Sequence, residues 1–285
     1  MELNLSKVQE IGHKEIRAIS ITRTILNNTK GFKYDPINHT YTIDGVKLVS
    51  GTELISKYVK PFDTAMISEM SAKKYQREGH ATLGDARMVR QYWKLLGEHA
   101  SGLGTTGHIF CKLYWLNRNT VPITQLDVNA KKVMDAILQK YDIIEMELPR
   151  GSKKYLIGYT LDIVLRDKVS GEVVIGDFKF SSKFNNEQYK KLKGRNASLL
   201  NEPFGEFRDV AYDKGSIQLA LYKKLLKEDL NIDVNLSILI HIDGLGEENF
   251  YGDKGYKVYI TRDCDKEVND ILRPLESNES VIDLI

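Results

Sequence analysis

A chain of 285 residues, of which 28% are charged and 42% hydrophobic, has the composition of a globular protein and is long enough to bury a full core. The 41 basic and 39 acidic residues leave a net charge of +2, so any surface for nucleic acid must be local. Two widely spaced cysteines, Cys111 and Cys264, argue against a disulfide framework, a zinc ribbon and a four-cysteine iron–sulfur cluster.

The first six residues lack the basic-then-apolar pattern of a signal peptide, and no apolar run is long enough to span a bilayer. We therefore expect a soluble, intracellular protein of the cytoplasm that has no membrane partner. No repeat and no Pro/Gly/Ser-rich linker divides the chain.

The N-terminal third predicts a β-hairpin followed by helices. Residues 32–34 and 40–43 form short β-like segments, and the Asp44-Gly45 pair before residues 46–49 is a strong turn signal. From residue 50 to about residue 117 the pattern becomes helical.

The rest of the chain predicts a sheet with further helices. A helix is expected at 126–141, an irregular or helical insertion at 181–214, and further helices at 216–228 and 263–275. Strands are expected at 143–148, 155–166, 172–180, 236–242 and 256–261, the first three forming an antiparallel meander through turns at 150–154 and 168–171. Helices mixed with a central sheet predict an α/β or α+β fold.

Two acids and a lysine on the second and third strands form the candidate catalytic centre. Asp177 and Lys179 are two residues apart, so they point to one face of a strand. Across the hairpin, opposing residues have numbers that sum to about 339, which pairs Asp162 with Asp177. Neighbouring carboxylates repel unless a cation lies between them, and Mg²⁺ or Mn²⁺ prefers such oxygen ligands. Lys179 would then position or deprotonate a water, or stabilise charge on a phosphate. The alternative is a structural Asp–Lys pair.

Weaker signals surround this centre. Gln218 and Tyr222 share one face of a predicted helix. The segment 104–108 is expected to open a helix, with His108 in its first turn. Glu145 and Glu147 lie on one face of the first strand. Taken alone, each has an ordinary structural explanation as a packed histidine or a solvated strand edge.

The order of these motifs resembles that of a known superfamily. Gly-Thr-x-x-His, Glu, Gly-x-x-x-Asp, Asp-x-Lys and Gln-x-x-x-Tyr follow one another over about residues 104–261. This order resembles the PD-(D/E)XK nucleases, in particular the RecB-like exonuclease branch. The N-terminal segment with Ser50-Gly51-Thr52 is similar to that of phage exonucleases and of the mitochondrial genome maintenance exonuclease.

The resemblance implies a restriction-endonuclease-like core, a mixed central β-sheet flanked by helices, over residues 104–285. Residues 1–103 would be an N-terminal hairpin and helical extension. The chain would take one or two Mg²⁺ or Mn²⁺ ions. With two cysteines, it would belong to the members without an iron–sulfur cluster. Where the family has a proline before the first acid, this chain has Leu161.

The resemblance also assigns roles to individual residues. The metal ligands would be His108, Asp162, Asp177 and the backbone carbonyl of Phe178. Lys179 would be the catalytic lysine, Glu147 (or Glu145) would support the metal shell through water, and Gln218 would orient Lys179 or the attacking water. The residues expected to contact DNA are Tyr222, Ser50, Thr52, Thr105, Lys73, Lys74 and Arg77.

The helical stretch 63–99 has a composition suited to single-stranded DNA. Its basic and aromatic residues alternate, and such a mixture supplies cations for phosphates and flat rings for bases. They are Lys73, Lys74, Arg77, Arg87 and Arg90 with Tyr75, Tyr92 and Trp93. The alternative is a solvated helix face with its aromatic residues in the core. As an arch over the centre, the stretch would admit single strands, and a second basic cluster at 190–195 would be a mobile loop on the same path.

These observations favour a metal-dependent DNA exonuclease that hydrolyses phosphodiester bonds and prefers single strands or DNA ends, in phage-type recombination, repair or degradation. One alternative is a structure- or sequence-specific endonuclease on the same core. Another is an inactive DNA-binding subunit that docks a recombinase, a helicase or a single-strand-binding protein. A structural ion network in a protein unrelated to nucleic acids is the third.

Overall fold

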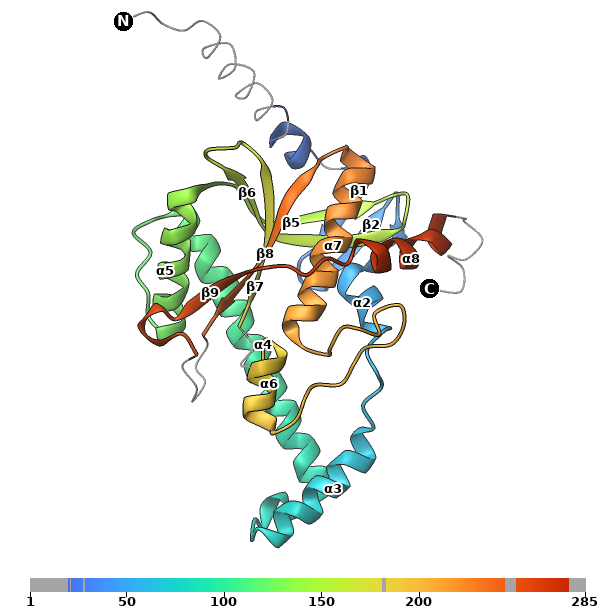
Figure 1. Cartoon of the computed structure of the whole chain (residues 1–285), viewed down its shortest axis with the longest axis vertical. Coiled ribbons are helices and arrows are strands. Elements are labelled where there is room, and N and C mark those ends of the chain that lie inside the picture. Colours follow the sequence, from blue (N-terminus) through green and yellow to red (C-terminus); the bar gives the residue numbers. More distant parts are fainter. Residues whose placement is uncertain (1–19, 21, 28, 181–182, 244–249, 277–285) are drawn as a thin grey trace, which may run out of the picture.

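A mixed β-sheet flanked by helices forms the body of the molecule, an α/β fold as expected (Figure 1). The computed structural model describes residues 20, 22–27, 29–180, 183–243 and 250–276. The N-terminal residues 1–6, in which no signal peptide is expected, lie outside these ranges. Among the helices within them, none combines the length and the apolar character needed to cross a membrane.

The described strands form two sheets. The smaller sheet contains β1 (Phe32–Asp35), β2 (Thr40–Ile43) and β3 (Val46–Lys47). In the larger sheet the strand order is β4-β6-β7-β8-β9, with β5 also paired to β6. Its strands are β4 (Val49–Ser50), β5 (Tyr141–Ser152), β6 (Ile157–Asp167), β7 (Val173–Lys179), β8 (Val234–Ile242) and β9 (Tyr256–Ile260).

Helices pack on both faces of the larger sheet and also extend away from it (Figure 1). They are α2 (Gly51–Ser56), α3 (Thr64–Arg77), α4 (Ala86–Leu116), α5 (Gln125–Lys140), α6 (Asn186–Lys193), α7 (Ala211–Leu230) and α8 (Asp265–Glu276), with short 3₁₀ turns η1 (Thr82–Gly84) and η2 (Gly252–Lys254). The expected N-terminal hairpin, the helix near 126–141, both late strands and the terminal helix are all confirmed, with shifted ends.

The antiparallel meander of β5, β6 and β7 carries the predicted register. Ile163 lies opposite Gly176 and Arg166 opposite Val173, so each pair of numbers sums to 339 as expected. Asp167 closes the connecting turn, because its Oδ1 accepts hydrogen bonds from the backbone amides of Val169 and Ser170. The register therefore directs Asp162 and Asp177 toward each other at the end of the hairpin ladder.

The first strand of the meander is longer than predicted. The sequence placed a turn at 150–154, whereas β5 continues to Ser152 and pairs through Gly151, opposite Gly158. Gly151 reads as a turn residue, but it is required here by close packing. A Cβ at this position would lie 2.6 Å from the Phe32 ring.

Alternation along β7 divides the core between the two sheet faces. Val173 and Ile175 belong to the cluster that includes the buried residues of α7 and α8. Val174 and Phe178 belong to the cluster formed with α4 and α5. Because both faces are covered, the strand is almost continuously apolar, and a charged residue such as Asp177 within it is an exception that calls for an explanation.

Two glycines predict opposite effects of the same substitution. A Cβ on Gly158 of β6 would lie 2.3 Å from Cγ of Tyr41, whereas a Cβ on Gly102 of α4 would meet no heavy atom within 4 Å. We expect Gly158→Ala to lower the free energy of unfolding by about 1–3 kcal/mol through overpacking. Gly102→Ala should raise it by about 0.5–1 kcal/mol through helix propensity. Urea denaturation measures both, and equal signs would contradict this packing of Tyr41.

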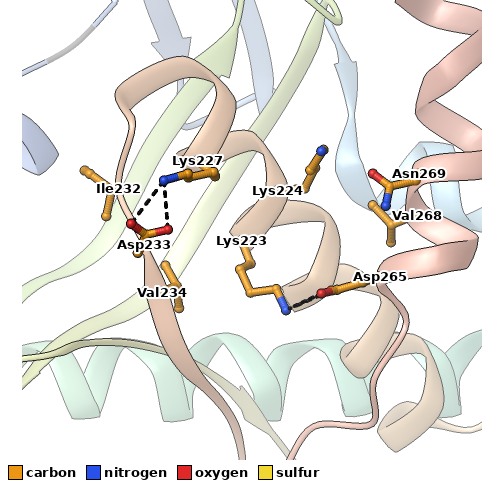
Figure 2. A pocket seen from close by; sticks show the side chains of 9 residues that line it. All are labelled: Lys223, Lys224, Lys227, Ile232, Asp233, Val234, Asp265, Val268 and Asn269. Atoms are coloured by element: carbon orange, nitrogen blue, oxygen red, sulfur yellow. Dashed lines mark hydrogen bonds and ion pairs between the residues drawn. The ribbon is translucent and has the colours of Figure 1, made fainter.

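A surface hollow of about 280 Å³ lies between α7, the start of β8 and α8 (Figure 2). None of the candidate site residues lines it. Three lysines of α7 line it, and each is paired with an acid: Lys223 with Asp265, Lys224 with Glu228 and Lys227 with Asp233. This lysine cluster is therefore neutralised locally.

Candidate metal and catalytic centre

His108 reaches the centre from the interior of a long helix. The expectation that a helix opens at residue 104 is wrong, because α4 runs without a break from Ala86 and is capped by Asp85. Thr105 does not cap a helix; its hydroxyl donates to the carbonyl of Ser101 one turn earlier. The boundary expected between residues 103 and 104 also falls inside this helix.

Gly107 explains how α4 approaches the sheet. A Cβ at this position would lie 2.4 Å from the ring of Phe180, which follows directly on β7. The missing side chain lets the helix come close to the end of the strand that carries Asp177 and Lys179. The histidine next to it, His108, is thereby brought to the same place, with Phe178 and Phe180 in edge contact with its ring.

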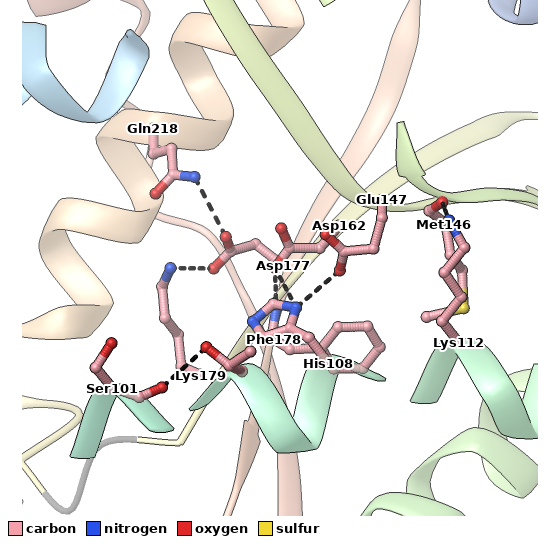
Figure 3. Close-up of polar contacts among 11 residues, drawn as sticks. Ser101, His108, Lys112, Met146, Glu147, Asp162, Asp177, Phe178, Lys179 and Gln218 are labelled. Atoms are coloured by element: carbon pink, nitrogen blue, oxygen red, sulfur yellow. Dashed lines mark hydrogen bonds and ion pairs between the residues drawn. The ribbon is translucent and has the colours of Figure 1, made fainter. Parts of the chain in front are cut away.

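Three side chains with metal-binding atoms converge here from α4, β5 and β6 (Figure 3). His108 Nδ1 lies 2.9 Å from Glu147 Oε1 and 3.7 Å from Asp162 Oδ2. One ligand atom from each of the three residues lies within 4.8 Å of the others. Asp162 Oδ2 also accepts a hydrogen bond of 2.9 Å from the amide of Phe178. The expected ligands His108 and Asp162 therefore lie together.

Glu147 lies closer to the centre than the sequence suggested. Its carboxylate contacts His108 directly, while the expected substitute Glu145 bonds instead to the amide of Met146 in its own strand. Glu147 has a φ of +53° within β5, a left-handed conformation that costs a residue with a side chain on the order of 1–3 kcal/mol. Strain of this kind at a polar cluster is typical of a residue held in place for function.

Asp177, Lys179 and Gln218 form the other half of the centre (Figure 3). Lys179 Nζ lies 2.5 Å from Asp177 Oδ2, and Gln218 Nε2 of α7 donates to Asp177 Oδ1 over 3.3 Å. The Asp177 side chain is only 4% exposed. Gln218 therefore binds the acid that holds the lysine, rather than Lys179 itself.

The charges of the two halves act on one another. Burial and then the charge of Asp177 raise the pKa of Asp162 to about 8, against the opposing effect of His108 and Lys179. Burial lowers the pKa of His108, but Asp162 and Glu147 outweigh it and raise the value to about 9. Burial also lowers the pKa of Lys179, but the charge of Asp177 outweighs burial and raises this pKa above its usual value. Lys179 therefore remains a cation.

Sequence reasoning missed a polar contact beside Asp162. The Tyr41 hydroxyl of the small sheet and Thr160 Oγ1 of β6 lie 2.9 Å apart. Thr160 is two residues from Asp162, so the period of the strand alone predicts that both face the same way. Tyr41 could not be found in this manner, because its position depends on the packing of a separate sheet.

Tyr222 does not agree with the role expected for it. The ring is 3% exposed, stacks on Tyr159 with centroids 4.8 Å apart, and lies against Gly51. The structure thus leaves it no surface for DNA and gives it a packing role. The adjacent Ser50 caps α2 by accepting the amide hydrogen of Glu53, and its Oγ lies 3.2 Å from Thr52 Oγ1.

The segment 63–103, which we name the arm, extends from the body as α3, η1 and the first part of α4 (Figure 1). Lys73, Lys74 and Arg77 are exposed on it, as expected for a surface that meets a polyanion. Arg90 instead ties α4 to α3 through a 2.8 Å hydrogen bond to Ser68. Of the three aromatic residues, Tyr92 is 42% exposed, while the ring of Tyr75 contacts His80 and that of Trp93 contacts Phe62.

The basic cluster at 190–195, expected as a loop, lies on and just after α6. Asn185 caps the start of this helix, and Gly194, with a φ of +67°, ends it.

Compared with known proteins, the chain matches no family model and no curated sequence.

Proposed function

We propose that the chain is a metal-dependent DNA nuclease with a core of the restriction-endonuclease type, acting as an exonuclease on single strands or DNA ends. The observation that carries this proposal is the convergence of His108, Glu147 and Asp162 beside the Asp177–Lys179 pair. A structural ion network does not need a buried Asp177 that raises the pKa of the neighbouring Asp162, with a strained glutamate next to them. Such a costly arrangement is typical of a catalytic centre.

The donor set of the centre fits a hard divalent cation. Carboxylates and a carbonyl are the ligands that Mg²⁺ and Mn²⁺ prefer, and imidazole is also accepted by Mn²⁺. His108, Asp162, Asp177 and the carbonyl of Phe178 would hold the ion, with Glu147 close enough to join them or to orient His108. When bound, such an ion polarises a phosphate and lowers the pKa of a water.

The protein's own groups have separate tasks in phosphodiester hydrolysis. Lys179, a cation beside Asp177, is placed to donate hydrogen bonds to a phosphate oxygen as negative charge develops there. Gln218 fixes Asp177 and thereby the lysine. Glu147 fixes the ring orientation of His108. The centre is thus organised before substrate arrives, which is the condition for electrostatic catalysis.

A gel assay tests the proposal. End-labelled linear single-stranded DNA, linear double-stranded DNA and circular DNA are incubated with Mg²⁺, Mn²⁺ or EDTA. The proposal predicts shortening of linear strands in the metal-containing samples and none in EDTA. Nicking of circles would favour an endonuclease on the same centre. No cleavage with either metal would contradict the proposal.

The arm gives a second, independent expectation. Replacing Lys73, Lys74 and Arg77 by glutamine should weaken binding of single-stranded DNA, because three phosphate contacts are lost. The dependence of log K on log salt should flatten by about 2, at roughly 0.7 per contact. Fluorescence anisotropy of a labelled oligonucleotide in EDTA measures both quantities.

The matched control for the arm replaces Lys223, Lys224 and Lys227 by glutamine. It removes the same number of charges from a cluster in which every lysine is paired with an acid, whereas on the arm Lys74 pairs with Glu78 and Lys73 and Arg77 form no ion pair with a described residue. Its affinity should stay within about twofold of the wild type, because locally neutralised lysines release few counterions from DNA. An arm variant that binds as tightly as this control would remove the arm from the DNA path.

A further inference from the structure

The end of helix α6 and the residue after its C-cap carry a group of uncompensated cations. Lys190, Lys193 and Arg195 are exposed, and none forms an ion pair or a side-chain hydrogen bond with a described residue. The α7 lysines provide the contrast: Lys223 and Lys227 are paired with Asp265 and Asp233 (Figure 2), and Lys224 is paired with Glu228. Two clusters of equal charge therefore differ in whether the charge is free to act on a ligand.

The chain holds the start of α6 near the candidate centre. Lys183 follows Lys179 by four residues, so their Cα atoms are at most about 14 Å apart. Phe184 is fully buried and stacks on His241 with ring centroids 4.3 Å apart. His241 is the partner of Lys179 in the parallel pairing of β7 with β8. The start of α6 is thus anchored beside the end of the strand that carries the catalytic lysine.

The helix itself is fixed rather than loosely attached. Gln188 Nε2 donates to the Tyr251 hydroxyl over 3.2 Å, and this hydroxyl also contacts Tyr259 of β9. Asn185 and Gln188 form a capping box at the first turn. The cations of α6 therefore occupy a defined place relative to the sheet, which distinguishes them from charges on a free loop.

The helix dipole does not account for the whole group. Cations in the last turn of a helix are favourable, which explains Lys190 and Lys193 in part. Arg195 lies beyond the terminating Gly194 and is not a residue of the helix, so a preference for cations in the last helical turn does not explain it. Lys183 and Lys193 also repel, since burial and then the charge of Lys193 lower the pKa of Lys183. A polyanion would relieve this crowding.

We propose that Lys190, Lys193 and Arg195 bind successive phosphates of the DNA strand next to the candidate centre. This inference rests on the proposed nuclease function and extends its substrate path beyond the cleaved bond. Lys190 and Lys193 are about one turn apart, roughly 4.5 Å along the axis of α6, and Arg195 follows directly after its C-cap. Three successive phosphates of a strand rise about 7 Å along B-form DNA, a distance that these long side chains can span.

The test compares two triple variants with equal loss of charge. One is Lys190→Gln/Lys193→Gln/Arg195→Gln, and the control is Lys223→Gln/Lys224→Gln/Lys227→Gln. Affinity for a fluorescein-labelled 30-nucleotide oligothymidine is measured in EDTA over a range of KCl concentrations. The α6 variant should bind on the order of 10- to 100-fold more weakly at 0.1 M salt, with a salt slope smaller by about 2. The control should bind within about twofold of the wild type.

A second readout separates substrate binding from chemistry. Turnover of thymidine 5′-(p-nitrophenyl phosphate) with Mn²⁺ should be the same for the α6 variant and the wild type, because this small diester does not reach α6. On long DNA the α6 variant should show a raised KM and an unchanged kcat. Equal affinities of the α6 variant and the control for the oligonucleotide would overturn the inference while leaving DNA cleavage by the wild type intact. A wild type that neither binds nor cleaves DNA would overturn the proposed function as well.

Discussion

Replacing Lys179 by alanine is expected to lower kcat for DNA hydrolysis by about 10²- to 10⁴-fold. The reason is that Lys179, held 2.5 Å from Asp177, is the cation best placed to meet charge that develops on a phosphate. Single-turnover cleavage of a labelled oligonucleotide with Mn²⁺ measures the change. Binding of Mn²⁺, followed by calorimetry, should persist, since Lys179 is not among the proposed ligands.

The same variant has a consequence for stability. Asp177 would remain buried without its cation, so the free energy of unfolding in EDTA should fall by about 3 kcal/mol. Added Mn²⁺ should restore part of this loss by supplying another cation. Lys131→Ala serves as the control because it removes an exposed pair with Asp135 far less costly to break. A Lys179→Ala enzyme with wild-type kcat would refute the assignment of the lysine.

Replacing Asp162 by asparagine should stabilise the metal-free protein at pH 8–9 while it abolishes metal-dependent cleavage. Burial and Asp177 raise the pKa of Asp162 to about 8, well above the value of an unfolded aspartate. The stability contributed by this group is thus present at low pH and is lost as the pH rises through 8. The amide of asparagine does not ionise, so the variant keeps this stability at high pH. We expect its free energy of unfolding to exceed that of the wild type by about 1–2 kcal/mol.

Urea denaturation in EDTA, with and without added Mn²⁺, measures this exchange of stability for function. The wild type should gain stability from Mn²⁺, whereas Asp162→Asn should gain little because a ligand has been removed. Asp142→Asn, which alters an exposed ion pair with Arg166, should keep the wild-type response to Mn²⁺. A destabilised Asp162→Asn protein at pH 9, or one that still responds fully to Mn²⁺, would contradict the role of Asp162 as a buried metal ligand.

Much of the sheet could be predicted because local signals decide it. The Asp44-Gly45 turn and the alternation around it predicted the small sheet. The tight turn after Asp167 fixes the register of β6 and β7. Counting residues outward from this turn was therefore enough to predict that Asp162 lies opposite Asp177. These features depend on the period of a strand and on the geometry of a short turn, both of which are visible in the sequence.

The errors arise where tertiary packing overrides local pattern. Gly104 and Gly107 resemble the start of a helix, but they lie inside α4, where Gly107 makes room for Phe180. The spacing of Gln218 and Tyr222 predicts a shared helix face without saying what covers it, and here Gly51 and Tyr159 bury the tyrosine. The left-handed backbone of Glu147 likewise has no local signal.

In the proposed mechanism, a divalent cation held by His108, Asp162 and Asp177 meets the DNA phosphate that is cleaved. The most direct measurement is anomalous scattering from Mn²⁺ in crystals of the Lys179→Ala variant with a short single-stranded oligonucleotide. We expect a peak in contact with the carboxylates of Asp162 and Asp177 and with one phosphate oxygen of the DNA. A peak elsewhere, or DNA bound away from these two acids, would contradict this mechanism.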